Sequence, residues 1–216
     1  MSRIVAIAGS TGLVGSMLRH QLQLREEVSE IRLLQRSPQG IQSSKENEII
    51  VNYELFDQVA AALEGVDELY CCIGTTNKKV QGNKSAYRKV DFDIPLALGK
   101  AAKKNGIKVM LKISAAGADA QSVNSYARLK GEIEEALKNL DLESLYIVRP
   151  SMLLGPRKEF RFGEKMGQII MQIFHWIIPK KWRAVQASDV AKAMIVKAKK
   201  PQKGNHVISN EEIQLF

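Results

Sequence analysis

The chain has 216 residues, of which 45% are hydrophobic and 25% charged, a composition typical of one globular domain rather than a disordered or fibrous protein. The formal net charge of +9 is compatible with binding of nucleic acid, anionic lipid or a phosphorylated ligand. No known nucleic-acid-binding motif accompanies this charge, so solvated helix ends and loops are the simpler interpretation and a nucleic-acid partner is not expected.

Two adjacent cysteines, Cys71 and Cys72, are poorly placed to bond each other and have no metal-ligand spacing to other residues. They indicate a reducing compartment, which we take to be the cytoplasm, and no metal site. Residues 4–18 superficially resemble a signal peptide, but their spaced glycines fit a strand, turn and helix better. The apolar stretch 169–178 is too short to cross a bilayer, so no membrane partner is expected.

Short apolar segments alternate along the chain with amphipathic segments. Strands are predicted at residues 3–8, 31–34, 48–51, 68–73, 109–113, 145–148 and 206–208. Helices are predicted at residues 13–24, 56–63, 85–105, 122–140, 163–176 and 187–198. The alternation predicts an α/β protein with a Rossmann-type doubly wound parallel sheet. We expect one domain over residues 1–216, in which residues from about 151 to 216 contribute a small C-terminal lobe on the substrate side.

The first predicted strand runs directly into the glycine-rich stretch Gly9-Ser10-Thr11-Gly12-Leu13-Val14-Gly15. Three glycines at this spacing, between a strand and an amphipathic helix, are typical of a loop that binds the pyrophosphate of a dinucleotide on backbone amides. The hydroxyls of Ser10 and Thr11 are candidates to reach phosphate oxygens or to cap the helix.

The end of the second predicted strand indicates which dinucleotide is bound. An acidic residue usually accepts the ribose 2′-hydroxyl of NAD here, but residues 33–37 contain no carboxylate. Arg36 is suited to pair with a 2′-phosphate, so NADP is favoured over NAD. The alternative is an arginine that merely faces solvent.

Three further predicted strands end in loops that we expect to line one crevice, because ligands bind beyond the carboxyl ends of parallel strands. These loops begin with Gly74-Thr75-Thr76, with Ser114 and with Arg149-Pro150-Ser151. Ser114 is a candidate to orient a substrate carbonyl, or it simply ends its strand.

Tyr126 and Lys130 are four residues apart in a predicted helix, so their side chains leave the same face. An ammonium beside the phenol favours the phenolate, so Tyr126 is a candidate proton donor for carbonyl reduction. Such a pair arises easily by chance, and only its position after the fifth strand makes it informative.

Several segments together resemble the short-chain dehydrogenase/reductase superfamily, in particular its atypical, compact members such as the Tat-interacting oxidoreductase-like NADPH-binding proteins. The segments that carry the resemblance are Cys71-Cys-Ile-Gly-Thr-Thr76, Ser114-Ala-Ala-Gly-Ala-Asp119, Tyr126-Ala-Arg-Leu-Lys130, Val148-Arg-Pro-Ser-Met-Leu-Leu-Gly155 and Ala187-Ser-Asp-Val-Ala-Lys-Ala193. The resemblance covers nearly the whole chain.

The resemblance implies a role for each matching position. The three glycines would hold the pyrophosphate, Arg36 would face the ribose phosphate, and Lys130 would bind the nicotinamide ribose beside the catalytic Tyr126. Gly74, Thr75, Thr76, Pro150 and Met152 would flank the cofactor. The chain departs from the pattern at Ala115 and Ala116, near the usual catalytic serine, and at Asn52, where relatives often have an aspartate. The helix asparagine of the catalytic set has no firm counterpart, and Asp91 is the nearest candidate.

These observations favour an NADP(H)-binding oxidoreductase that reduces a small carbonyl or oxidises an alcohol, with Ser114, Tyr126 and Lys130 as catalytic residues. One alternative is a non-catalytic NADPH-sensing module that contacts a protein partner, which the altered serine region favours. Another is a nucleotide-sugar epimerase or dehydratase, for which the short C-terminal lobe leaves little room.

Overall fold

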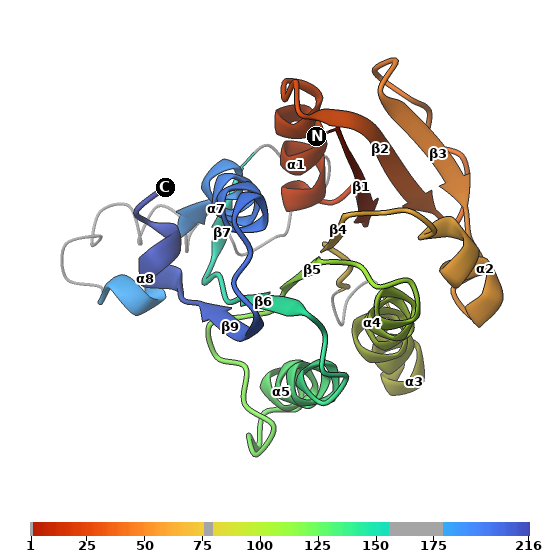
Figure 1. The fold of residues 1–216 in the computed structure, drawn as a ribbon. Helices are drawn as coiled ribbons and strands as arrows, with labels where there is room; N and C mark the ends of the chain where they lie inside the picture. The colour runs from red at the N-terminus through yellow and green to blue at the C-terminus, as the bar shows by residue number, and fades with distance from the viewer. Residues whose placement is uncertain (1, 76–79, 156–178) are drawn as a thin grey trace.

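The computed structural model describes residues 2–75, 80–155 and 179–216, which form a seven-stranded sheet with helices on both faces (Figure 1). The strands are β1 (Arg3–Ala8), β2 (Val28–Gln35), β3 (Glu46–Ile50), β4 (Glu68–Cys71), β5 (Val109–Ile113), β6 (Ser144–Val148) and β9 (Gly204–Ile208). All neighbouring pairs are parallel, in the order β3-β2-β1-β4-β5-β6-β9. The chain reverses its direction of winding between β1 and β4, and such a switch point is where sheets of this kind bind ligands.

The helices form two layers. Helices α1 (Leu13–Gln23) and α7 (Ala187–Lys199) pack together on one face of the sheet (Figure 1). The other face carries α2 (Phe56–Ala62), α3 (Lys84–Arg88), η1 (Lys89–Asp93), α4 (Ile94–Lys104) and α5 (Ser125–Lys138). Two apolar cores follow from this arrangement, one on each face of the sheet. The central strands contribute to both, since side chains alternate along each strand, and this explains why β1 has almost no polar residues.

The fold class is confirmed, and the boundaries of β1 and β5 agree with the prediction. The helix predicted at 85–105 is observed as α3, η1 and α4 in direct succession, where η1 is a π-helical turn. The predicted helix 163–176 lies outside the described residues.

Part of the range assigned to a C-terminal lobe belongs to the main sheet layers, because α7 packs on α1 and β9 pairs with β6. The described elements beside them are β7 (Leu153–Leu154), η2 (Lys180–Trp182), β8 (Val185–Gln186) and α8 (Asn210–Ile213). Strands β7 and β8 form a separate two-stranded sheet. These short elements were not predicted, because segments of two to four residues have no readable periodicity.

Candidate functional site

The glycine-rich loop joins β1 to α1 at the switch point of the sheet. Gly9 has φ of +87°, a conformation that residues with a Cβ rarely adopt, and it directs the chain into a tight turn closed by the Gly12 amide on the Gly9 carbonyl at 3.1 Å. A Cβ on Gly15 would lie 2.1 Å from the Gly9 oxygen, so only glycine allows α1 to approach the turn this closely. Two of the three glycines are therefore required by the backbone itself.

The side chains of Ser10 and Val14 in this loop are buried, so at these positions the loop presents its backbone. Ser10 is buried, and its hydroxyl accepts a hydrogen bond from the Gln35 side chain at 2.7 Å. No side chain caps α1, so the expectation that Ser10 or Thr11 caps this helix is wrong. Val14 lies in the core, and Leu13 packs against it. The first-turn amides of a helix have no partner within the helix, which is why the start of α1 is the predicted position of the pyrophosphate.

Arg36 follows β2 directly and is exposed to solvent. Burial raises the pKa of Tyr53, and the charge of Arg36 opposes this effect. The hydroxyl of the buried Tyr53 donates to the Leu34 carbonyl at 2.9 Å. The last residue of β2, Gln35, is turned toward Ser10, so a neutral amide occupies the strand end next to Arg36. This arrangement leaves a cation, and no carboxylate from residues 33–37, at the adenosine end of the switch point.

The loop after β4 is anchored on a buried carboxylate. Asp91, in the π-helical turn η1, is fully buried and its Oδ2 accepts from the Thr75 amide at 2.8 Å. Gly74 is exposed, and a Cβ there would lie 3.6 Å from both Asp91 Oδ1 and Lys130 Nζ. Thr76 lies outside the described residues. The described part of this loop is thus held beside the predicted catalytic helix.

Tyr126 and Lys130 share one face of α5, as predicted, and Lys130 Nζ lies 5.8 Å from the centre of the Tyr126 ring. The tyrosine is 46% exposed, whereas Lys130 is buried with its Nζ 2.6 Å from Asp91 Oδ1. Among the described residues Asp91 Oδ1 has no partner with hydrogen-bond geometry, so its contact with Lys130 is an ion pair. The open phenol therefore stands above a buried lysine that Asp91 holds in place.

A second phenol lies close to this pair. Burial raises the pKa of Tyr87, and the negative charge of Asp91 adds to the effect. The sequence analysis did not single it out, because a tyrosine in the short helix α3 has no spacing signal toward α5.

Ser114 is buried at the end of β5, and its hydroxyl donates to Oε1 of Glu134 on α5. Glu134 is fully buried and also accepts hydrogen bonds from the Arg149 guanidinium, at 3.1 Å and 3.2 Å from Nε. The Ser114 hydroxyl donates its hydrogen to Glu134, so in this arrangement the oxygen is left only as a hydrogen-bond acceptor. Glu134 was missed by the sequence analysis, which considered helix α5 for Tyr126 and Lys130 alone. Arg149 was named there only as the start of the loop after β6, without its ion pair to Glu134.

The loop after β6 reaches the same edge of the sheet. The Pro150 carbonyl accepts from the Ala116 amide at 2.9 Å, and the Met152 carbonyl accepts from the Val185 amide at 2.9 Å. Buried Asn210 accepts from the Ser151 amide at 2.7 Å and donates to the carbonyls of Lys180 and Arg183, at 2.9 Å each. Asn210 therefore fixes the segment around η2 against the loop that was predicted to flank the cofactor.

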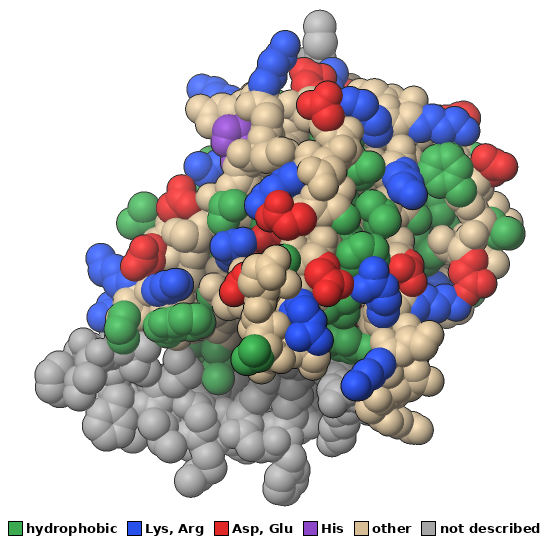
Figure 2. Space-filling model, turned by 90° about the horizontal axis from the view of Figure 1, so that it is seen from below, with side chains coloured by type: hydrophobic (Ala, Val, Ile, Leu, Met, Phe, Trp, Pro, Cys, Tyr) green, Lys and Arg blue, Asp and Glu red, His purple; other side chains and the backbone are tan. Residues whose placement is uncertain are grey.

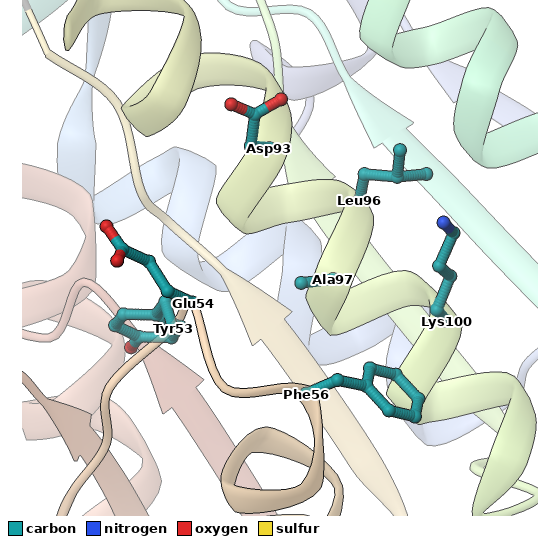
Figure 3. A pocket seen from close by; sticks show the side chains of 7 residues that line it. All are labelled: Tyr53, Glu54, Phe56, Asp93, Leu96, Ala97 and Lys100. Carbon is teal, nitrogen blue, oxygen red and sulfur yellow. The ribbon is translucent and has the colours of Figure 1, made fainter.

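A pocket of about 450 Å³ lies at the other end of this edge, between the residues after β3 and helix α4 (Figure 3). The residues that line it are Tyr53, Glu54, Phe56, Asp93, Leu96, Ala97 and Lys100. The hydroxyl of Tyr53 donates to the carbonyl of Leu34, two residues before Arg36, so the pocket lies near the end of β2. The pocket does not include Tyr126 or Lys130.

The described residues contain no group of three metal-ligating side chains. Within the same residues no helix is long and apolar enough to span a membrane. On the face shown in Figure 2, lysines and arginines are interspersed with acidic residues rather than gathered into one basic patch. That distribution is in keeping with solvated surface charge.

The fold and the glycine loop define a dinucleotide-binding protein of Rossmann type, and comparison with known proteins gives its family. Residues 9–199 match the model of the NAD(P)H-binding family. The chain is 29% identical to protein HTATIP2 of Rattus norvegicus, over 98% of this chain and 88% of the relative. It is 32% identical to protein fmp52 of Emericella nidulans, over 76% of this chain and 72% of the relative. The chain belongs to the NAD(P)H-binding family, within the atypical short-chain dehydrogenase/reductase group that the sequence resembled.

Solved structures share the fold at low sequence identity. The UDP-N-acetylglucosamine 4-epimerase of Methanobrevibacter ruminantium superposes with a TM-score of 0.75 at 18% identity, over 96% of this chain and 76% of that chain. MoeE5, solved with UDP-glucose and NAD, gives a TM-score of 0.71 at 15% identity, over 97% of this chain and 79% of that chain. These similarities confirm the Rossmann-type fold.

The expectation of a cytoplasmic location is wrong by this comparison. Relatives from Coccidioides immitis, Emericella nidulans, Eremothecium gossypii and Candida albicans are all named mitochondrial. The expectation rested on two unbonded cysteines, which report the redox state of a compartment and not which compartment it is.

Proposed function

We propose that this protein is an NADP(H)-dependent oxidoreductase that reduces a small carbonyl compound or oxidises the corresponding alcohol. The observation that carries the proposal is the arrangement at α5, where the half-exposed Tyr126 stands over Lys130 and Lys130 is held by Asp91. This arrangement lies next to the loop after β4, at the sheet edge that carries the glycine loop.

In the proposed reaction, bound NADPH supplies a hydride to the carbonyl carbon. The Tyr126 hydroxyl gives its proton to the carbonyl oxygen, so the product is an alcohol and a phenolate remains. The Lys130 ammonium stabilises that phenolate, and the proton is replaced from solvent because Tyr126 is exposed. In reverse, the phenolate accepts the proton of the alcohol. Ser114 assists by position, because its hydroxyl is bound to Glu134 on α5, the helix that carries Tyr126 and Lys130.

The preference for NADP over NAD is proposed from Arg36. The 2′-phosphate of NADPH is an anion that a guanidinium binds with charge-assisted hydrogen bonds, and NADH lacks it. The Arg36→Gln variant is expected to lose roughly tenfold in NADPH affinity, the usual scale of one such bond, with NADH affinity unchanged. Calorimetry with both dinucleotides measures this, and an equal loss for both would contradict the assignment.

The decisive test of catalysis is Tyr126→Phe. We expect turnover of NADPH with a panel of small aldehydes and ketones to fall by roughly 100-fold or more, while NADPH affinity is kept. The matched control is Tyr146→Phe, which removes a hydroxyl that accepts from the Gln202 amide at 3.0 Å. Unchanged turnover in Tyr126→Phe would remove this residue from the mechanism.

A second candidate function is a regulatory module that binds NADPH and a protein partner without turnover. It is supported by Ser114, whose proton is occupied by Glu134, and by Lys130, whose charge is balanced by Asp91. This function predicts that Tyr126→Phe behaves normally in cells while a Gly12→Asp variant fails. An epimerase or dehydratase acting on a nucleotide sugar ranks below both, because the superposed epimerase is 18% identical to this chain and shares only its fold.

A further inference from the structure

Lys112 is a fully buried lysine in the middle of the sheet. It lies on β5, in register with Cys71 of β4 on one side and Ile147 of β6 on the other. By strand alternation it shares the face of Met110, which belongs to the core beneath α4 and α5. Cationic side chains are almost never fully buried without a partner, so this position calls for an explanation.

The ammonium group of Lys112 joins the ends of two strands. Its Nζ donates to the carbonyl of Ile73, at 3.2 Å, and to that of Ile113. Ile73 directly precedes the Gly74–Thr75 loop, and Ile113 directly precedes Ser114. Lys112 therefore lies immediately beneath the edge where the nicotinamide is proposed to bind.

The charged groups around Lys112 leave a net positive charge. Lys130 on α5 and Asp91 on η1 are the ionised groups that interact with it, and Cys71 and Cys72 are the titratable groups on β4. Burial raises the pKa of both thiols, so they are neutral at pH 7. Two ammonium groups and one carboxylate give this cluster a charge of +1. Glu134 and Arg149, the pair bound to Ser114, balance each other.

We infer that Lys112 makes the site prefer the reduced cofactor, NADPH, over the oxidised form, NADP⁺. The two forms carry the same phosphates and differ in the ring, which is neutral in NADPH and cationic in NADP⁺. A buried positive charge beneath the ring opposes the cationic form only, and it thereby favours the reductive direction. This inference rests on the proposed function, because it requires the nicotinamide to lie at Tyr126 and Lys130.

The ratio of the two affinities is the informative quantity, since a merely structural effect of a substitution changes both alike. We expect NADP⁺ to bind about tenfold more weakly than NADPH at pH 7, the effect of one charge on the order of 10 Å away in the effective dielectric of a protein. Burial and the neighbouring Lys130 lower the pKa of Lys112 to about 8. The ammonium is lost as the pH rises through that value, so the ratio should fall toward one above pH 8.

Calorimetric titration with NADPH and NADP⁺ from pH 6.5 to 9.5 tests this on the wild type, on Lys112→Met and on Lys108→Met. Methionine has a similar length and suits the apolar core, so the first variant is expected to fold. Lys108 is an exposed lysine just before β5, paired with Asp67 at 3.2 Å, and it serves as the matched control.

The expected result is a ratio near one at every pH in Lys112→Met and a wild-type ratio in Lys108→Met. A ratio that is unchanged by Lys112→Met, or independent of pH in the wild type, would overturn the inference while leaving NADPH binding intact. If neither dinucleotide binds the wild-type protein, the proposed function fails, and the inference fails with it.

Discussion

The predicted crevice has a backbone half, at the glycine loop, and a side-chain half, at helix α5. At the glycine loop, the predicted donors for the pyrophosphate are backbone amides, and the side chains of Leu13, Val14 and Ser10 pack into the protein. At α5, the chemistry depends on side chains from separate elements, with Tyr126 and Lys130 on one helix and Asp91 on another. A backbone site needs only a local chain path, whereas a side-chain site needs several distant residues to meet. The first is therefore most sensitive at its glycines, and the second at each of the side chains that must meet.

The largest effect is expected at Asp91. The Asp91→Ala variant leaves Lys130 buried without a counter-ion and the Thr75 amide without its acceptor. Loss of one partner of a buried ion pair typically costs about 3–5 kcal/mol, so thermal unfolding should shift to a clearly lower temperature. Glu132→Ala is the matched control, because the Arg88–Glu132 pair at 2.9 Å is exposed and such pairs contribute about 1 kcal/mol or less. Equal shifts in the two variants would show that the side-chain half does not depend on this ion pair.

A charge placed in the glycine loop tests the backbone half. Gly12 has φ of −72°, which any residue adopts, and a Cβ there meets only the Gly9 carbonyl at 3.3 Å. Gly12→Asp should therefore fold while its carboxylate repels the pyrophosphate, which lowers NADPH affinity by roughly 100-fold or more. Gly12→Ala is the control for the added bulk, and titration with NADPH measures both variants. Retained affinity in Gly12→Asp would place the dinucleotide elsewhere.

The smallest effect is expected at Ser114, where a substitution distinguishes a structural role of the hydroxyl from a role in the reaction. Its hydroxyl donates to Glu134, which keeps its bonds to Arg149 when Ser114 is replaced by alanine. We expect Ser114→Ala to lower the free energy of unfolding by about 1 kcal/mol and turnover by only a few-fold. Chemical denaturation and steady-state kinetics measure the two quantities. A loss of turnover as large as that of Tyr126→Phe would make Ser114 essential to the reaction.

The sequence by itself determined the fold class, the glycine loop and the Tyr126–Lys130 face. Each depends on local regularities, namely the alternation of strands and helices, a strand–turn–helix spacing, and an interval of four residues on one helix. The predicted bounds of β1 and β5 agree with the structure for the same reason.

Only the tertiary structure decided which residues surround these features. Asp91 contacts Lys130 across 39 positions of sequence, Glu134 accepts a hydrogen bond from the Ser114 hydroxyl, and Lys112 reaches the carbonyl of Ile73 from a neighbouring strand. The family resemblance named Asp91 as the nearest counterpart of a catalytic asparagine, but the local sequence does not show that Asp91, Glu134 and Lys112 are buried or what they contact. Their roles follow from burial, because a charge removed from water requires a partner, and the partner is supplied by whichever element the fold brings beside it.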